Sequence, residues 1–175
     1  MKTGIFVKLL GVLAIHLGMI GLYWTIVSFV LATQDNLSAT VLDRTEGDAQ
    51  RIAANIAEVS GAMLSPGIIS ILVGAVLGSL WLLLVDRKPP HGELDARKKR
   101  GPWAGLLLLA LGAGGFSFFL LLIGAPVAEM LAKNVPLQAM IAGLLLLALG
   151  YWVSTGLLVV NSAKVAVPAS RILGA

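Results

Sequence analysis

The sequence predicts an all-α integral membrane protein, a bundle of four transmembrane helices with both termini in the cytoplasm. Its 175 residues are 58% hydrophobic and only 13% charged, whereas about 25% of residues are charged in typical soluble domains. Four charge-free apolar windows each exceed the roughly 18 residues that a transmembrane helix requires. The basic residues collect on alternate sides of these windows, which is the pattern that sets orientation in a bilayer.

The expected transmembrane helices cover residues 9–32, 63–85, 103–125 and 137–160. The first resembles a secretory signal peptide, since Lys2 and Lys8 precede it. Its apolar run is longer than the about 7–15 residues of a signal sequence, so we expect a retained transmembrane helix. The longest connections are an external loop over residues 33–62 and a basic cytoplasmic loop over 86–102, too short for a second domain. We therefore expect one membrane domain over residues 1–175.

The distribution of Lys and Arg gives the orientation. Ten of the thirteen lie on one predicted side, namely Lys2, Lys8, Arg87, Lys88, Arg97, Lys98, Lys99, Arg100, Lys164 and Arg171. The other side carries only Arg44, Arg51 and Lys133. Because basic loops stay in the cytoplasm, both termini are expected there, in a bacterial cytoplasmic (inner) membrane. The net charge of +4 is therefore interpreted as topology and not as a nucleic-acid surface.

Two connecting segments carry their own patterns. In the external loop, Ile52, Ile56 and Val59 repeat at helical spacing among polar residues, which predicts a short amphipathic helix. We favour a helix lying on the headgroups or capping its own bundle over one that docks an external partner. In the basic loop, Arg97, Lys98, Lys99 and Arg100 form a run beside the membrane, and such runs usually contact anionic lipid headgroups.

Small residues mark the expected contact faces, because helices in lipid associate through close backbone approach. At about 100° per residue they align on the first, second and fourth helices. The glycines expected to pack are Gly11, Gly18, Gly21, Gly74, Gly78, Gly143 and Gly150. The third helix has small residues on two sides. Its remaining surface, which includes Phe116 and Phe119, suits either lipid or a neighbouring subunit.

One internal repeat is visible. Residues 104–112 and 142–150 both read Ala-Gly-Leu-Leu-Leu-Leu-Ala-Leu-Gly. Inverted repeats of this kind occur in transporters. Because the match uses only three residue types, we favour shared helix-packing composition over a true duplication.

His16 is the only histidine deep within an apolar window. It lies eight residues beyond Lys8, about 12 Å along a helix and so near the bilayer centre. It shares a face with Met19 and Tyr23, opposite the glycine stripe of its helix. If that stripe packs within the bundle, this face points outward and must meet a polar partner.

Three roles are open for His16: a hydrogen bond to this chain or a partner, an axial bond to a haem or chlorophyll-type metal, and a proton relay. The plain hydrogen bond is favoured. A haem site of this kind would need Met19 or another chain to complete it, since His91 lies in the cytoplasmic loop.

No Asp, Glu, Lys or Arg lies inside the four windows, which counts against ion-coupled transport and intramembrane catalysis. We therefore expect a protein that is not an enzyme. The expected function is that of a structural or accessory subunit, which binds other membrane-protein subunits of a larger complex through glycine-lined faces. The alternatives are a small transporter or channel component, and a pigment- or haem-binding subunit that uses His16.

Overall fold

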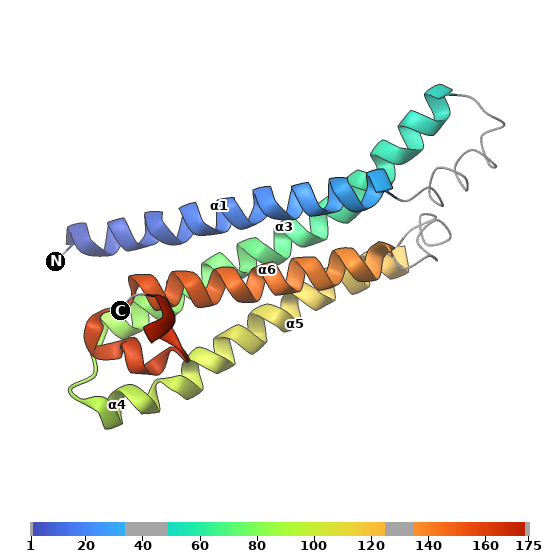
Figure 1. Ribbon diagram of the computed structural model, residues 1–175. Helices are drawn as coiled ribbons and strands as arrows, with labels where there is room; N and C mark the ends of the chain where they lie inside the picture. The colour runs from blue at the N-terminus through green and yellow to red at the C-terminus, as the bar shows by residue number, and fades with distance from the viewer. Residues whose placement is uncertain (1, 34–48, 125–134, 174–175) are drawn as a thin grey trace.

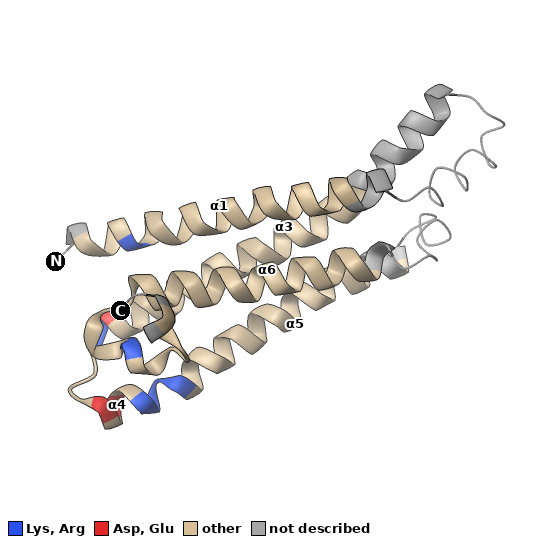
Figure 2. Ribbon diagram, viewed as in Figure 1, with Lys and Arg blue, Asp and Glu red and all other residues tan. Residues whose placement is uncertain are grey.

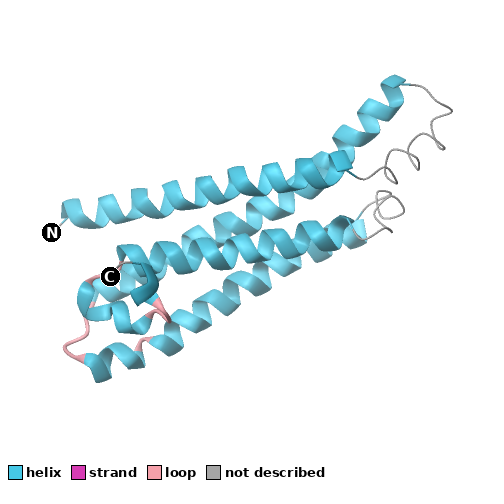
Figure 3. Cartoon of the chain, in the orientation of Figure 1, coloured by secondary structure: helices cyan, strands magenta, loops and turns pink. Residues whose placement is uncertain are grey.

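The computed structural model describes residues 2–33, 49–124 and 135–173. They form the helices α1 (Lys2–Thr33), α3 (Ala49–Arg87), α4 (Glu93–Lys98), α5 (Arg100–Gly124) and α6 (Val135–Leu158), followed by the 3₁₀ helices η2 (Asn161–Ala166) and η3 (Ser170–Leu173). Within these ranges all regular structure is helical (Figure 3). Four segments are long and apolar enough to cross a membrane, Gly4–Phe29, Gly61–Arg87, Glu93–Leu120 and Leu137–Leu158. The all-helical, four-span prediction agrees with this.

The central pair of the bundle is α3 and α6, and α1 and α5 lie on opposite sides of it (Figure 1). Both outer helices contact both central ones. The central helices are the more deeply buried ones. In the most apolar 18-residue stretch of each span, 44% is buried in α3 and in α6, compared with 22% in α5 and 11% in α1. The outer helices therefore present most of their surface outward, where apolar side chains suit the lipid bilayer.

The start of α1, the helix α4 and the 3₁₀ segments lie at the same end of the bundle (Figure 1). Most of the charged residues of the described chain gather there as well (Figure 2). Lys8 Nζ lies 2.8 Å from both carboxylate oxygens of Asp86, which joins α1 to the end of α3. We call this region the basic end.

The helix α3 begins at Ala49, well before its apolar window. The residues Ile52, Ile56 and Val59, expected in a separate amphipathic helix, instead belong to the backbone of this long helix. That expectation is corrected for residues 49–62: no proline precedes Pro66, so nothing in this stretch interrupts the helix. Residues 34–48 of the expected loop lie outside the described residues.

Candidate functional site

His16 is fully buried between the two central helices. Its Nδ1 lies 2.8 Å from the carbonyl oxygen of Val12, to which it donates one turn back along α1. A Cβ atom placed on Gly74 of α3 would lie 3.6 Å from His16 Nε2, and one on Gly150 of α6 only 3.2 Å. The imidazole ring therefore fills a gap that exists because both central helices have glycine at this level.

The second ring nitrogen of His16 is left without a partner. Since Nδ1 donates to a carbonyl, Nε2 carries the lone pair, and among the described residues no group hydrogen-bonds to it. The side chain of Met19 packs on the same glycine, with Cγ 3.2 Å from the Cβ position of Gly150. Within the described chain, no three His, Asp or Glu residues come together as a metal site would require.

An axial bond from His16 to a tetrapyrrole does not fit this geometry. The face of a macrocycle would have to lie next to Nε2, and α6 packs there so closely that a Cβ atom on Gly150 would lie 3.2 Å from this nitrogen. The full burial of His16 and Tyr23 within the chain also leaves no open side at His16 from which a pigment could approach. The arrangement is that of a ring packed into a glycine groove.

The expected orientation of α1 is therefore reversed. His16 and Tyr23 were predicted to face a partner, but both are fully buried within the chain, and Met19 packs beside them. Gly18 and Gly21 were predicted to pack, but neither has another heavy atom within 4 Å of its Cβ position. The physical reason is steric: the deepest grooves are supplied by the glycines of α3 and α6, and large side chains fill them.

The other five glycines that were predicted to pack do lie at contacts. Gly11, near the basic end of α1, meets the side chain of Leu158 at 3.0 Å, and Gly78 of α3 lies 3.5 Å from the Tyr151 ring. Gly74 and Gly150 enclose His16, as described above. A Cβ atom on Gly143 of α6 would lie 3.0 Å from Phe118 Cζ. All distances in this paragraph are measured from such an added Cβ atom.

Tyr23 forms a second ring contact, about two turns beyond His16. Its ring lies directly against Gly67 of α3, where a Cβ atom would overlap it. Its hydroxyl donates to the carbonyl oxygen of Met63 at 2.8 Å. A tyrosine in lipid needs such a partner, and here α3 supplies it.

Two serines that the sequence placed on separate helices meet at the next level. Ser70 Oγ of α3 lies 3.1 Å from Ser117 Oγ of α5. Ser70 donates to the carbonyl oxygen of Pro66 at 2.6 Å, and Ser117 to that of Gly114 at 2.7 Å. The spacing of small residues within one helix does not show that these two serines meet.

A third polar group lies near the basic end and was not predicted. Trp103 Nε1 donates to Thr155 Oγ1 at 3.0 Å, and the hydroxyl of Tyr151 donates to the carbonyl oxygen of Trp103 at 3.0 Å. The sequence signal was misleading, because tryptophan near a helix end is typical of an anchor in the headgroup region. Here Trp103 and Tyr151 are buried and join α5 to α6.

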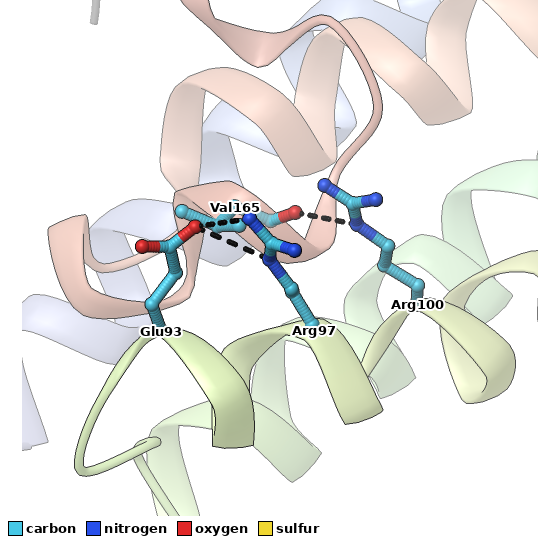
Figure 4. Close-up of polar contacts among 4 residues, drawn as sticks. All are labelled: Glu93, Arg97, Arg100 and Val165. Atoms are coloured by element: carbon cyan, nitrogen blue, oxygen red, sulfur yellow. Dashed lines mark hydrogen bonds and ion pairs between the residues drawn. The ribbon is translucent and has the colours of Figure 1, made fainter.

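At the basic end, the four residues predicted to contact headgroups, Arg97 to Arg100, differ in whether they bond to other groups of the chain (Figure 4). Arg97 bonds Glu93 at 2.6 Å, and Arg100 Nε donates to the carbonyl oxygen of Val165 at 2.9 Å. Lys98 is exposed and Lys99 is half-buried. Two of the four basic side chains are thus partly engaged in holding α4 and the C-terminal segment in place.

The buried polar groups do not provide an open aqueous path. Six polar residues in the bundle are fully buried, namely His16, Tyr23, Ser70, Tyr151, Ser154 and Thr155. Except for Nε2 of His16, their side-chain polar atoms are hydrogen-bonded within the chain. This counts against water-filled conduction along these residues.

The outer face of α5 carries the remaining predicted contact residues. Phe116 and Phe119 are exposed, and their ring centroids lie 6.3 Å apart. Gly105 and Gly112 also lie on exposed positions of this helix.

No family model, curated protein or solved structure matches the chain.

Proposed function

We propose that this protein is a non-catalytic structural or accessory subunit of a larger membrane complex. The observation that carries the proposal is the outward glycine face of α1. Gly18 and Gly21 have no heavy atom within 4 Å of their Cβ positions, and Ala14 and Thr25 beside them are exposed. A face of small residues is poorly suited to lipid alone and well suited to another helix.

A second outward face supports the same function. Gly105, Gly112 and Gly115 of α5 have no heavy atom within 4 Å of their Cβ positions. Phe116 and Phe119 flank them and provide large apolar contact surfaces. Because α1 and α5 lie on opposite sides of the bundle, the protein can contact two neighbours at once (Figure 1).

The proposed orientation places the basic end in the cytoplasm of a bacterial cell, at its inner membrane. Helix α4 with Lys98 and the 3₁₀ helix η2 with Lys164 lie at that end, together with the start of α1, and Lys88 directly follows α3 there (Figure 1). The positive-inside rule favours this orientation. Cysteines introduced singly at Gly18 and at Lys98 give a direct test, since the natural chain has no cysteine. Only the Lys98 cysteine is expected to react with a membrane-impermeant reagent added from the cytoplasmic side.

The subunit proposal is tested by purification from native membranes in a mild detergent. We expect the wild-type chain to bring stoichiometric partner proteins with it. The double variant Gly18→Leu/Gly21→Leu should lose at least one partner while keeping its helical content, because bulk on α1 prevents close helix approach.

A matched control adds bulk to an exposed face that has no glycine. Leu145→Phe/Leu149→Phe on α6 should retain the partners. Recovery of the wild-type chain as a lone, monodisperse monomer would reject the proposal. Equal partner loss from both double variants would reject the role of the α1 face.

A further inference from the structure

A groove runs along the outer surface between α1 and α3, with a volume of about 640 Å³. Its floor is formed by Val12 and Ala75, which are buried. Its walls are mostly apolar and are formed by Leu9, Leu13, Leu72, Val76, Leu80 and Leu83, together with Ser79.

The length of the groove matches one leaflet of a bilayer. From Leu72 to Leu83 the axis of α3 advances about 16 Å, at roughly 1.5 Å per residue. This is about half of the roughly 30 Å hydrocarbon core. A transmembrane helix of a partner would cross the whole core, whereas a single acyl chain covers one leaflet. The dimensions therefore favour a lipid chain.

At the end of the groove that is nearest the basic end of the bundle lies the positively charged side chain of Arg87. Arg87 follows Leu83 by four residues and Leu80 by seven, so it continues the same face of α3. It is exposed, and within the described chain no hydrogen bond or ion pair engages its side chain. One turn beyond the apolar lining is the level at which a headgroup phosphate would lie.

The charges beside Arg87 favour an anion. The nearest carboxylate along the helix is Asp86, and Lys8 neutralises it with two contacts of 2.8 Å. The next residue, Lys88, is exposed and adds a second positive charge. Phosphate oxygens are good acceptors for a guanidinium group, which can donate two parallel hydrogen bonds.

We propose that this groove binds one anionic phospholipid from the leaflet at the basic end. One acyl chain lies over Val12 and Ala75, and the phosphate is bound by Arg87 with Lys88 nearby. This site is separate from the outward glycine face of α1, and it does not depend on the proposed subunit function.

Native mass spectrometry of the full chain in a mild detergent tests the site. The probes are phosphatidylglycerol and phosphatidylcholine with identical acyl chains. We expect one tight phosphatidylglycerol adduct, preferred over phosphatidylcholine by about fivefold, the effect of one basic side chain at a membrane surface. Arg87→Gln should reduce the preference to less than twofold. Lys164→Gln, which removes the charge of a basic residue on η2, should leave it unchanged.

A second variant tests the groove separately from the charge. Val76→Trp fills the groove from its exposed wall and should weaken the first adduct of both lipids. Helical content and thermal midpoint in detergent are measured for each variant to confirm the fold. Equal binding of the two lipids to the wild type, as a series of weak adducts, would overturn the proposal. So would a tight, selective adduct that survives in Arg87→Gln or in Val76→Trp.

Discussion

Residues 104–112 and 142–150 have the same nine-residue sequence but opposite surroundings. The last glycine of the α6 copy, Gly150, has His16 Nε2 at 3.2 Å from its Cβ position. The equivalent glycine of the α5 copy, Gly112, has no heavy atom within 4 Å. Identical local sequence thus gives one packed and one open surface.

The fourth leucine of each copy differs in the same way. Leu147 of α6 is fully buried and packs on Gly74, whereas its equivalent Leu109 in α5 is 59% exposed. Both positions are apolar, and in lipid neither the inside nor the outside of a bundle is selected by hydrophobicity. The α6 copy is inside because rings from α1 and α5 fit its glycines. Steric fit, and not composition, decides which copy is buried.

The largest expected difference between the copies comes from removing a leucine. Leu147→Ala should lower the free energy of unfolding by about 2–3 kcal/mol, near the lower end of values for soluble cores because lipid already solvates leucine. Leu109→Ala should change it by less than about 0.5 kcal/mol. Unfolding in mixed micelles, followed by circular dichroism, measures both. Equal losses would show that the α5 copy is buried too.

The glycines provide the next test. Gly150→Val should cost about 1–2 kcal/mol, because the added methyl groups overlap His16 and Met19. Gly112→Val is the matched control, since the helix propensity of valine enters both variants equally. We expect it to lie within about 0.5 kcal/mol of the wild type in the same unfolding assay. A comparable cost at Gly112 would contradict the packing described here.

A double-mutant cycle identifies the ring responsible. In a His16→Ala background, the cost of Gly150→Val should fall by about 1 kcal/mol, since the space that the ring occupied becomes available. All four proteins of the cycle are unfolded under identical conditions. Strict additivity would mean that His16 and Gly150 do not share a contact.

The smallest expected effect concerns the first glycine of each copy. Gly143→Ala should destabilise by about 0.5–1 kcal/mol, because its Cβ would lie 3.0 Å from the Phe118 ring, which has to shift. Gly105→Ala should instead stabilise by up to about 1 kcal/mol through helix propensity. The thermal midpoints of the two variants should therefore move in opposite directions. A shift of the same sign in both would remove this distinction.

The candidate site was only partly predictable. The sequence selected His16 as an unusual residue and placed Tyr23 on the same face, and the structure keeps them together. The sequence assigned the face of His16 and Tyr23 to the outside. The reason was that the opposite face, which contains Gly18 and Gly21, resembles an interior surface. The pairing of Ser70 with Ser117 required the relative rotation of two helices, which periodicity within one helix does not contain.

The sequence alone determined the number and approximate limits of the membrane-spanning helices, because the length of an uncharged apolar stretch is set by the thickness of hydrocarbon. Only the tertiary structure decided which face of each helix points inward. Inside and outside are equally apolar in a bilayer, so the choice depends on whether a ring on one helix finds a glycine at the same level on another. That match between His16, Gly74 and Gly150 involves three helices and exists only when they are assembled.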